Sequence, residues 1–115
     1  MAEHRHTVYV SHHAQERWAE RGSAQGSAYA NVEDIITYWS EACFQVPFHM
    51  VYRAMRLKHR NFKAQETHDY YWDGAELLFA LTKGQRGEQR TMKTIIKLNA
   101  AQAACLEPAR PKDDP

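Results

Sequence analysis

The chain has 115 residues, 43% of them hydrophobic, and a formal net charge of +1. This length predicts one domain with a single core, which needs no disulfide or structural metal to fold. The small net charge argues against a dedicated non-specific DNA-binding protein, and the apolar runs are much shorter than the roughly 20 residues that span a membrane. Because the polar first residues are unlike a signal peptide, we expect a soluble cytoplasmic protein without membrane partners.

The cysteine and histidine residues show no metal-binding pattern. Cys43 and Cys105 lack the paired spacing of zinc ligands or of a disulfide framework, so we expect two reduced thiols. The seven histidines form no H-E-x-x-H motif, although four of them gather near the N-terminus. We therefore expect neither a catalytic metal nor another cofactor.

The first elements in chain order are a flexible start, a strand and a helix. Residues 1–7 are polar and are expected to be flexible. The β-prone run from Thr7 to Val10 predicts a short strand. A helix follows it, because Ser11 is typical of an N-cap and Gly22 is typical of the residue just past a helix end.

On this helix His13, Arg17 and Arg21 form one row, since residues four apart share a face. Like charges at this spacing destabilise a helix by about 0.2–0.5 kcal/mol, and an anion lying across the row would remove that cost. An imidazole beside two guanidiniums suits phosphodiester chemistry, because the imidazole moves a proton and the guanidiniums neutralise phosphate charge. We therefore predict that these three residues are catalytic.

Two other interpretations of the row stay open. In the first, the helix is an ordinary solvated one and Arg17 pairs with Glu20. In the second, Arg17 and Arg21 pair with carboxylates of the next helix or with carbonyls at the end of the sheet, and they only stabilise the fold.

The middle of the chain predicts a loop, a second helix and a strand. Residues 23–30 are small and typical of a loop. From Asn31 onwards apolar residues recur at helical spacing, which predicts a helix that ends by Pro47 and has the core stripe Val32, Ile35, Ile36 and Trp39. The stretch 48–65 fits either a helix or a strand, and we favour a strand near Val51–Leu57 followed by a basic turn at 58–61.

The last third predicts a β-hairpin, another strand, a short helix and a tail. Asp73 and Gly74 predict a hairpin turn between the runs 68–72 and 76–81. Residues 91–98 predict a strand with Thr94 on one face and Lys93 and Lys97 on the other, unless a β-bulge intervenes. Asn99 is typical of the cap of a helix at 100–106, and the proline-rich residues 107–115 predict a disordered tail.

These elements predict a single α+β domain over residues 8–106. Two N-terminal helices are expected to pack on one face of a three- to four-stranded antiparallel sheet. The strand at 91–98 is long and apolar, so we expect it near the centre of the sheet.

Positive charges gather in two acid-poor stretches, residues 53–63 and 83–97. Such local patches hold a phosphate backbone even where the total charge is near zero. We predict the following nucleic-acid contacts: Arg53, Arg56, Lys58, Arg60 and Lys97. The alternative is a solvated charged surface without a ligand.

The first-helix motif and the order of elements resemble a family of small prokaryotic and phage proteins, the DUF4258 domain. Its pattern S-x-H-A-x-x-R-x-x-E-R-G is matched by Ser11, His13, Ala14, Arg17, Glu20, Arg21 and Gly22. Its closing segment V-x-T-V-Y-K is similar to residues 93–97, with Thr94 at the threonine position. That family is similar to the RelE, barnase, EndoU and colicin ribonuclease folds, so the resemblance implies a RelE/barnase-like domain.

The resemblance implies a metal-independent endoribonuclease of toxin type, which leaves a 2′,3′-cyclic phosphate and a 5′-hydroxyl. His13 would be the general acid or base, with Arg17 and Arg21 on the phosphorane, Lys93 as an added positive charge and Thr94 on a phosphate oxygen. The implied partners are RNA and a cognate antitoxin or host protein, in the host-cell cytoplasm if a phage encodes the chain. The alternative is a non-catalytic phage or mobile-element protein that binds and inhibits a host protein or nucleic-acid complex.

Overall fold

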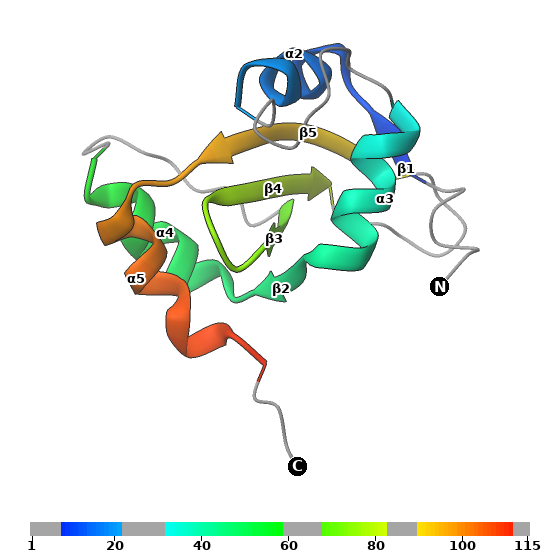
Figure 1. The fold of residues 1–115 in the computed structure, drawn as a ribbon. Helices are drawn as coiled ribbons and strands as arrows, with labels where there is room; N and C mark the ends of the chain where they lie inside the picture. The colour runs from blue at the N-terminus through cyan, green and yellow to red at the C-terminus, as the bar shows by residue number, and fades with distance from the viewer. Residues whose placement is uncertain (1–7, 22–31, 59–67, 83–89, 112–115) are drawn as a thin grey trace.

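A five-stranded mixed sheet forms the centre of the structure (Figure 1). A computed structural model describes residues 8–21, 32–58, 68–82 and 90–111. The strands lie in the order β1-β5-β4-β3-β2 and comprise β1 (Val8–Val10), β2 (Phe44–Val46), β3 (His68–Trp72), β4 (Leu77–Thr82) and β5 (Arg90–Lys97). The helices are α2 (His12–Arg21), α3 (Val32–Ala42), α4 (Phe48–Arg56), α5 (Ala100–Leu106) and the 3-10 helix η2 (Glu107–Ala109). None of these helices is long and apolar enough to cross a bilayer.

The α+β class predicted from the sequence is confirmed, but the predicted antiparallel sheet is wrong in detail. β1 runs parallel to β5, where Val8 pairs with Arg90, and only the other neighbouring strands are antiparallel. β2 adds a strand at the opposite edge of the sheet. The parallel pair joins segments from the two ends of the chain, so no local sequence pattern reveals it.

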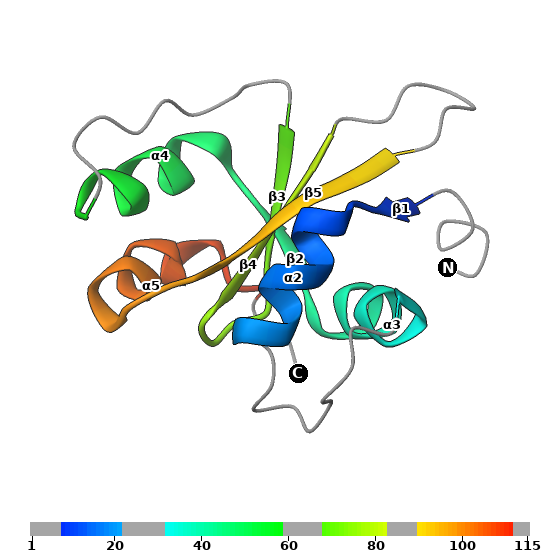
Figure 2. The same cartoon turned by 90° about the horizontal axis from the view of Figure 1, so that it is seen from above.

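Helices cover both faces of the sheet, whereas the sequence predicts helices on one face only. On one face α2 and α3 enclose the first core, and on the other face α4 and α5 enclose the second core (Figures 1 and 2). The reason lies in β4, the central strand, which is buried from Leu77 to Leu81. Its odd-numbered residues enter the first core and its even-numbered residues enter the second, so both faces need a cover. β5, predicted near the centre, lies next to β4.

The segment predicted as a strand near Val51–Leu57 is part of helix α4 instead. Its buried residues Val51, Ala54 and Met55 have helical spacing and enter the second core. The alternation of a strand would place Arg53 on the same face as Val51 and Met55, which would bury a charge. The helix therefore wins because it separates the apolar side chains from the cations.

The other predicted helices and strands are confirmed, whereas the predicted flexible residues 1–7, the loop at 23–30 and the basic turn from 59 onwards lie outside the described residues. Ser11 caps α2, since its Oγ accepts a hydrogen bond from the Ala14 N–H at 3.0 Å. Helix α3 buries most of its predicted stripe, although Val32 is 36% exposed. Asn99 caps α5 in a capping box with Gln102, where each side chain bonds the other residue's backbone N–H.

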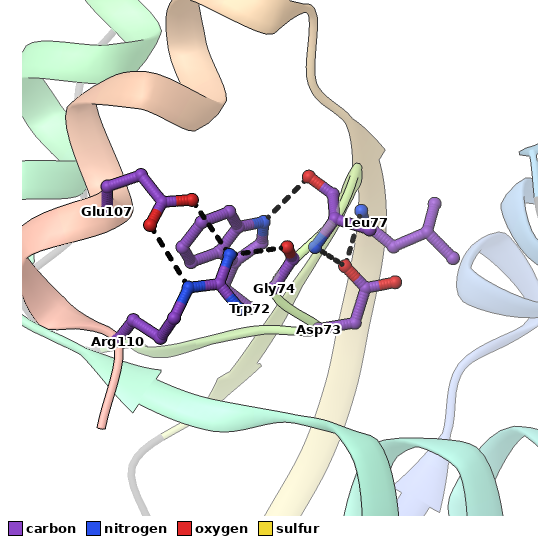
Figure 3. Close-up of polar contacts among 7 residues, drawn as sticks. Trp72, Asp73, Gly74, Leu77, Glu107 and Arg110 are labelled. Carbon is purple, nitrogen blue, oxygen red and sulfur yellow. Dashed lines mark hydrogen bonds and ion pairs between the residues drawn. The ribbon is translucent and has the colours of Figure 1, made fainter. Parts of the chain in front are cut away.

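The predicted hairpin joins β3 to β4, and its turn is built on Asp73 and Gly74. The Asp73 Oδ1 accepts hydrogen bonds from the N–H groups of Ala75 and Leu77, at 2.8 and 3.1 Å (Figure 3). Gly74 has a φ of +79°, a conformation that L side chains rarely adopt. A Cβ at this position would also lie 2.8 Å from the guanidinium of Arg110, so the turn needs glycine.

The C-terminal segment clasps this hairpin (Figure 3), although the sequence predicts disorder from residue 107. Arg110 donates hydrogen bonds to the Gly74 carbonyl and to the Glu107 carboxylate, both at 2.8 Å. Its guanidinium carbon lies 5.0 Å from the centre of the Trp72 ring. These contacts order residues 107–110, and the rest of the predicted tail from 112 lies outside the described residues.

Strand β5 contains a β-bulge next to its start. Ala80 of β4 pairs with Thr94, and the next residue, Leu81, pairs with Met92, so Lys93 is an extra residue on β5. A bulge changes which face of the sheet the following side chains occupy. The bulge anticipated as an exception at this strand is therefore present.

Candidate functional site

Helix α2 places the predicted His/Arg row over the first-core face of the sheet. Ala14 and Trp18 are buried in the first core, which leaves His13 exposed. Arg21 ends the helix, and its side chain lies outside the described structure. The row is thus partly solvent-facing, as a binding surface requires.

Within the described side chains, the arginine of the row is already paired. Arg17 donates a hydrogen bond to the Glu20 carboxylate at 2.7 Å. This confirms the ion pair that was predicted for an ordinary solvated helix. His12 faces Glu16 at 3.4 Å one row away. The Glu20 carboxylate therefore offsets the charge of Arg17, and the catalytic roles of His13, Arg17 and Arg21 stay predictions.

The β5 bulge brings Lys93 and Thr94 to the same face of the sheet. Met92 and Ile95, which flank them, both enter the first core, so the two residues between them lie toward the second-core face. Thr94 pairs there with Ala80, a member of the second core. Lys93 is exposed and Thr94 is half-buried.

His68 lies on this same second-core face, at the start of β3. It alternates with Tyr70 and Trp72, which both enter the second core, and its ring centre lies 6.5 Å from that of Tyr70. His68 pairs in register with Thr82 of β4. We name His68, Thr82, Lys93 and Thr94 the polar sheet patch.

The patch favours the neutral form of the His68 imidazole. Burial lowers the pKa of His68 below its ordinary value, and the nearby ammonium of Lys93 lowers the pKa further, while Asp69 opposes the shift. A neutral imidazole can accept a proton near pH 7. The patch thus combines a proton acceptor, a positive charge and a hydroxyl group on one sheet surface.

The structure does not bring all the predicted catalytic residues together. The sheet separates Thr94 from helix α2, because α2 packs on the first-core face through Ala14 and Trp18. Lys97 lies apart from the patch and faces Glu76 at 3.8 Å. Sequence reasoning missed His68. Its signal in the sequence is the spacing of His68, Tyr70 and Trp72, which places these three residues on one face of a strand before the hairpin turn.

The predicted nucleic-acid contacts on α4 are exposed. Arg53, Arg56 and Lys58 all face solvent, whereas Arg60 lies outside the described residues. Arg56 donates a hydrogen bond to the hydroxyl of Tyr52 at 2.6 Å, and its guanidinium carbon is 5.4 Å from the ring centre. Helix α4 packs beside β3, the strand that begins with His68 (Figure 2).

Other polar groups in the structure serve the fold. Arg90 reaches across the sheet to the Asp69 carboxylate at 2.9 Å and to the Tyr71 hydroxyl at 3.1 Å. The Tyr38 hydroxyl donates to the Asp73 carboxylate at 2.6 Å. Burial raises the pKa of Cys43 above its ordinary value, which disfavours the nucleophilic thiolate form.

The described residues hold no cluster of three His, Cys, Asp or Glu side chains that could bind a metal ion. No protein-family model, curated protein or solved structure matches the chain. The resemblance to the DUF4258 domain therefore stays a prediction.

Proposed function

We propose that this protein cleaves RNA without a metal ion and that the polar sheet patch is its reaction centre. The observation that carries the proposal is the β5 bulge, which gathers Lys93 and Thr94 on the face that carries His68. Lys93 and Thr94 keep the roles predicted from the sequence. His68 takes the proton-transfer role predicted for His13.

The three groups match the needs of a transesterification. The imidazole of His68 accepts the proton of a 2′-hydroxyl while the 2′-oxygen forms a bond to phosphorus. The bond from phosphorus to the 5′-oxygen breaks, and that oxygen takes a proton from water, while the resulting hydroxide takes the proton from the His68 imidazolium and restores the neutral ring. The Lys93 ammonium compensates the extra negative charge of the phosphorane, and the Thr94 hydroxyl donates a hydrogen bond to a non-bridging oxygen. The products are a 2′,3′-cyclic phosphate and a 5′-hydroxyl.

The test is cleavage of a labelled mixed-sequence RNA in EDTA, followed by analysis of the end groups. Wild type is compared with His68→Ala and with the matched control His13→Ala, which removes an exposed imidazole from α2. We expect cyclic phosphate ends from wild type and His13→Ala, and a loss of about a hundredfold or more in His68→Ala. Circular dichroism establishes that both variants are folded.

Two results would contradict this assignment. Loss of cleavage in His13→Ala but not in His68→Ala would move the centre to the α2 row. No cleavage by folded wild type would remove the catalytic proposal altogether.

The second candidate is a protein that binds nucleic acid without cleaving it. The exposed cations of α4 favour this candidate, because they supply phosphate contacts but no proton acceptor with a neighbouring hydroxyl. Wild type that binds labelled RNA and leaves it intact would establish binding alone. The predicted inhibition of a host protein would then be tested by a pull-down from host lysate.

A further inference from the structure

Helix α4 has two faces of opposite character. Val51, Ala54 and Met55 bury one face in the second core. The opposite face carries exposed residues at the spacing i, i+3, i+4 and i+7, namely His49, Tyr52, Arg53 and Arg56. We call these four residues the α4 stripe.

The α4 stripe belongs to a stretch of the sequence that has no acidic residue. No acidic residue stands between Glu41 and Glu66 in the sequence. A net charge of +1 for the whole chain therefore conceals a strongly positive segment.

The cations of the α4 stripe differ from most other described cations because they form no ion pair with a described carboxylate. Elsewhere four of the described cations pair with carboxylates, namely Arg17–Glu20, Arg90–Asp69, Lys97–Glu76 and Arg110–Glu107, whereas Lys93 forms no ion pair with a described carboxylate. Within the described residues, Arg53, Arg56 and Lys58 have no such carboxylate partner. The positive charge of α4 is thus available to an external anion.

Tyr52 gives the stripe an aromatic surface beside the charges. Tyr52 is 39% exposed, and Arg56 donates a hydrogen bond to its hydroxyl. An exposed ring next to guanidiniums is the combination that single-stranded nucleic acids need, because bases stack on the ring while cations hold the backbone. Bases of a duplex are already stacked on one another and gain nothing from the ring.

We propose that the α4 stripe binds single-stranded RNA, with Tyr52 stacking on an unpaired base and Arg53 and Arg56 contacting the phosphates. This inference rests on the proposed function, which makes RNA the ligand, and it adds that the bound RNA is single-stranded. Helix α4 itself contacts β3, which begins with His68, through the face opposite the stripe.

The test is fluorescence anisotropy with a labelled single strand of about 12 nucleotides, a length in the range of single-strand binding sites. Every ribose is 2′-O-methylated, so the strand lacks the attacking hydroxyl and cannot be cleaved. Arg53→Ala is compared with Arg110→Ala, a matched loss of one exposed arginine that pairs with Glu107. Tyr52→Ala is compared with Tyr52→Phe, which keeps the ring.

We expect Tyr52→Ala to weaken binding about tenfold, through loss of stacking, and Tyr52→Phe to bind like wild type. Arg53→Ala weakens binding and reduces the slope of log K against log salt by about 0.7, the value for one phosphate contact on a single strand. Arg110→Ala leaves both quantities unchanged.

Several results would overturn the inference. Equal weakening by Arg53→Ala and Arg110→Ala would show a general charge effect, and equal affinity for a duplex of the same sequence would exclude single-strand recognition. Failure to bind RNA, with Arg53-dependent binding of polyglutamate, would identify an acidic protein as the partner.

Binding and cleavage are measured separately, so the two proposals can fail separately. Stripe-dependent binding without cleavage of unmodified RNA would refute the proposed function and support this inference. Cleavage that depends on His68, with normal RNA binding by Arg53→Ala and Tyr52→Ala, would do the opposite.

Discussion

Helices α2 and α4 carry similar side chains in different electrostatic surroundings. Each packs on one face of the sheet and exposes histidine and arginine at helical spacing. On α2 Arg17 pairs with the carboxylate of Glu20 in the same helix. Helix α4 contains no acidic residue, and its arginines lie next to an exposed tyrosine.

The difference shows that a row of cations is a poor guide to a binding site unless the neighbouring acids are counted. An exposed ion pair contributes little to stability, but it reduces the charge that a phosphate encounters. The motif on α2 is the more conspicuous in the sequence. The surface on α4 is the better suited to hold an anion.

The largest expected effect comes from removing the anchor of each helix. Trp18→Ala and Met55→Ala each delete a buried side chain, and we expect each to lower the free energy of unfolding by about 3 kcal/mol in urea denaturation. Under conditions where both variants are folded, Met55→Ala should weaken RNA binding and Trp18→Ala should not, because Met55 lies on α4 and Trp18 lies on α2. Weaker binding by Trp18→Ala alone would assign the RNA surface to α2.

A smaller effect is expected from adding a carboxylate to α4 and from removing one from α2. His49→Glu places a carboxylate four residues before Arg53, so we expect RNA affinity to fall about fivefold, with His49→Gln as the control. Glu20→Gln releases Arg17 from its ion pair, and the expected gain in affinity is at most about twofold. A larger gain from Glu20→Gln would show that α2 lies against the bound strand.

The smallest expected effect is a dependence of stability on pH at the polar sheet patch. The lowered pKa of His68 means that the folded state binds this proton more weakly than the unfolded state. His68 therefore contributes stability that is present above its ordinary pKa and is lost as the pH falls through the lowered one. Urea denaturation between about pH 7.5 and 5.5 should show a steeper loss of stability in wild type than in His68→Gln.

Lys93→Gln tests the cause of that shift. It removes the ammonium that lowers the pKa of His68 but leaves the burial in place. We expect its pH dependence to fall between those of wild type and His68→Gln. A dependence identical to wild type would assign the whole shift to burial.

Much of the fold follows from local sequence signals. Ser11 and Asn99 identify the starts of two helices, because their side chains bond backbone N–H groups nearby in the chain. Asp73 and Gly74 identify the hairpin, since the turn depends on a local carboxylate and a positive φ. Each of these devices acts within a few residues and is therefore legible without the fold.

The candidate site was only partly predictable from the sequence. The sequence identifies Lys93 and Thr94 as candidates from their chemistry. The strict alternation of a strand would place them on opposite faces of the sheet, and only the pairing of β4 with β5 reveals the bulge. His68 stands alone in the sequence, 25 positions before Lys93, and becomes a candidate once β3 and β5 lie in one sheet.

The sequence by itself determined the α+β class, the capped helices, the hairpin and the acid-free basic segment, because these depend on composition and on neighbours along the chain. Tertiary structure decided the parallel β1–β5 pair, the cover on both faces of the sheet and the helical form of α4. It also decided which polar groups share a face. These features depend on how distant segments bury their apolar side chains together, and that choice is made only when the whole sheet assembles.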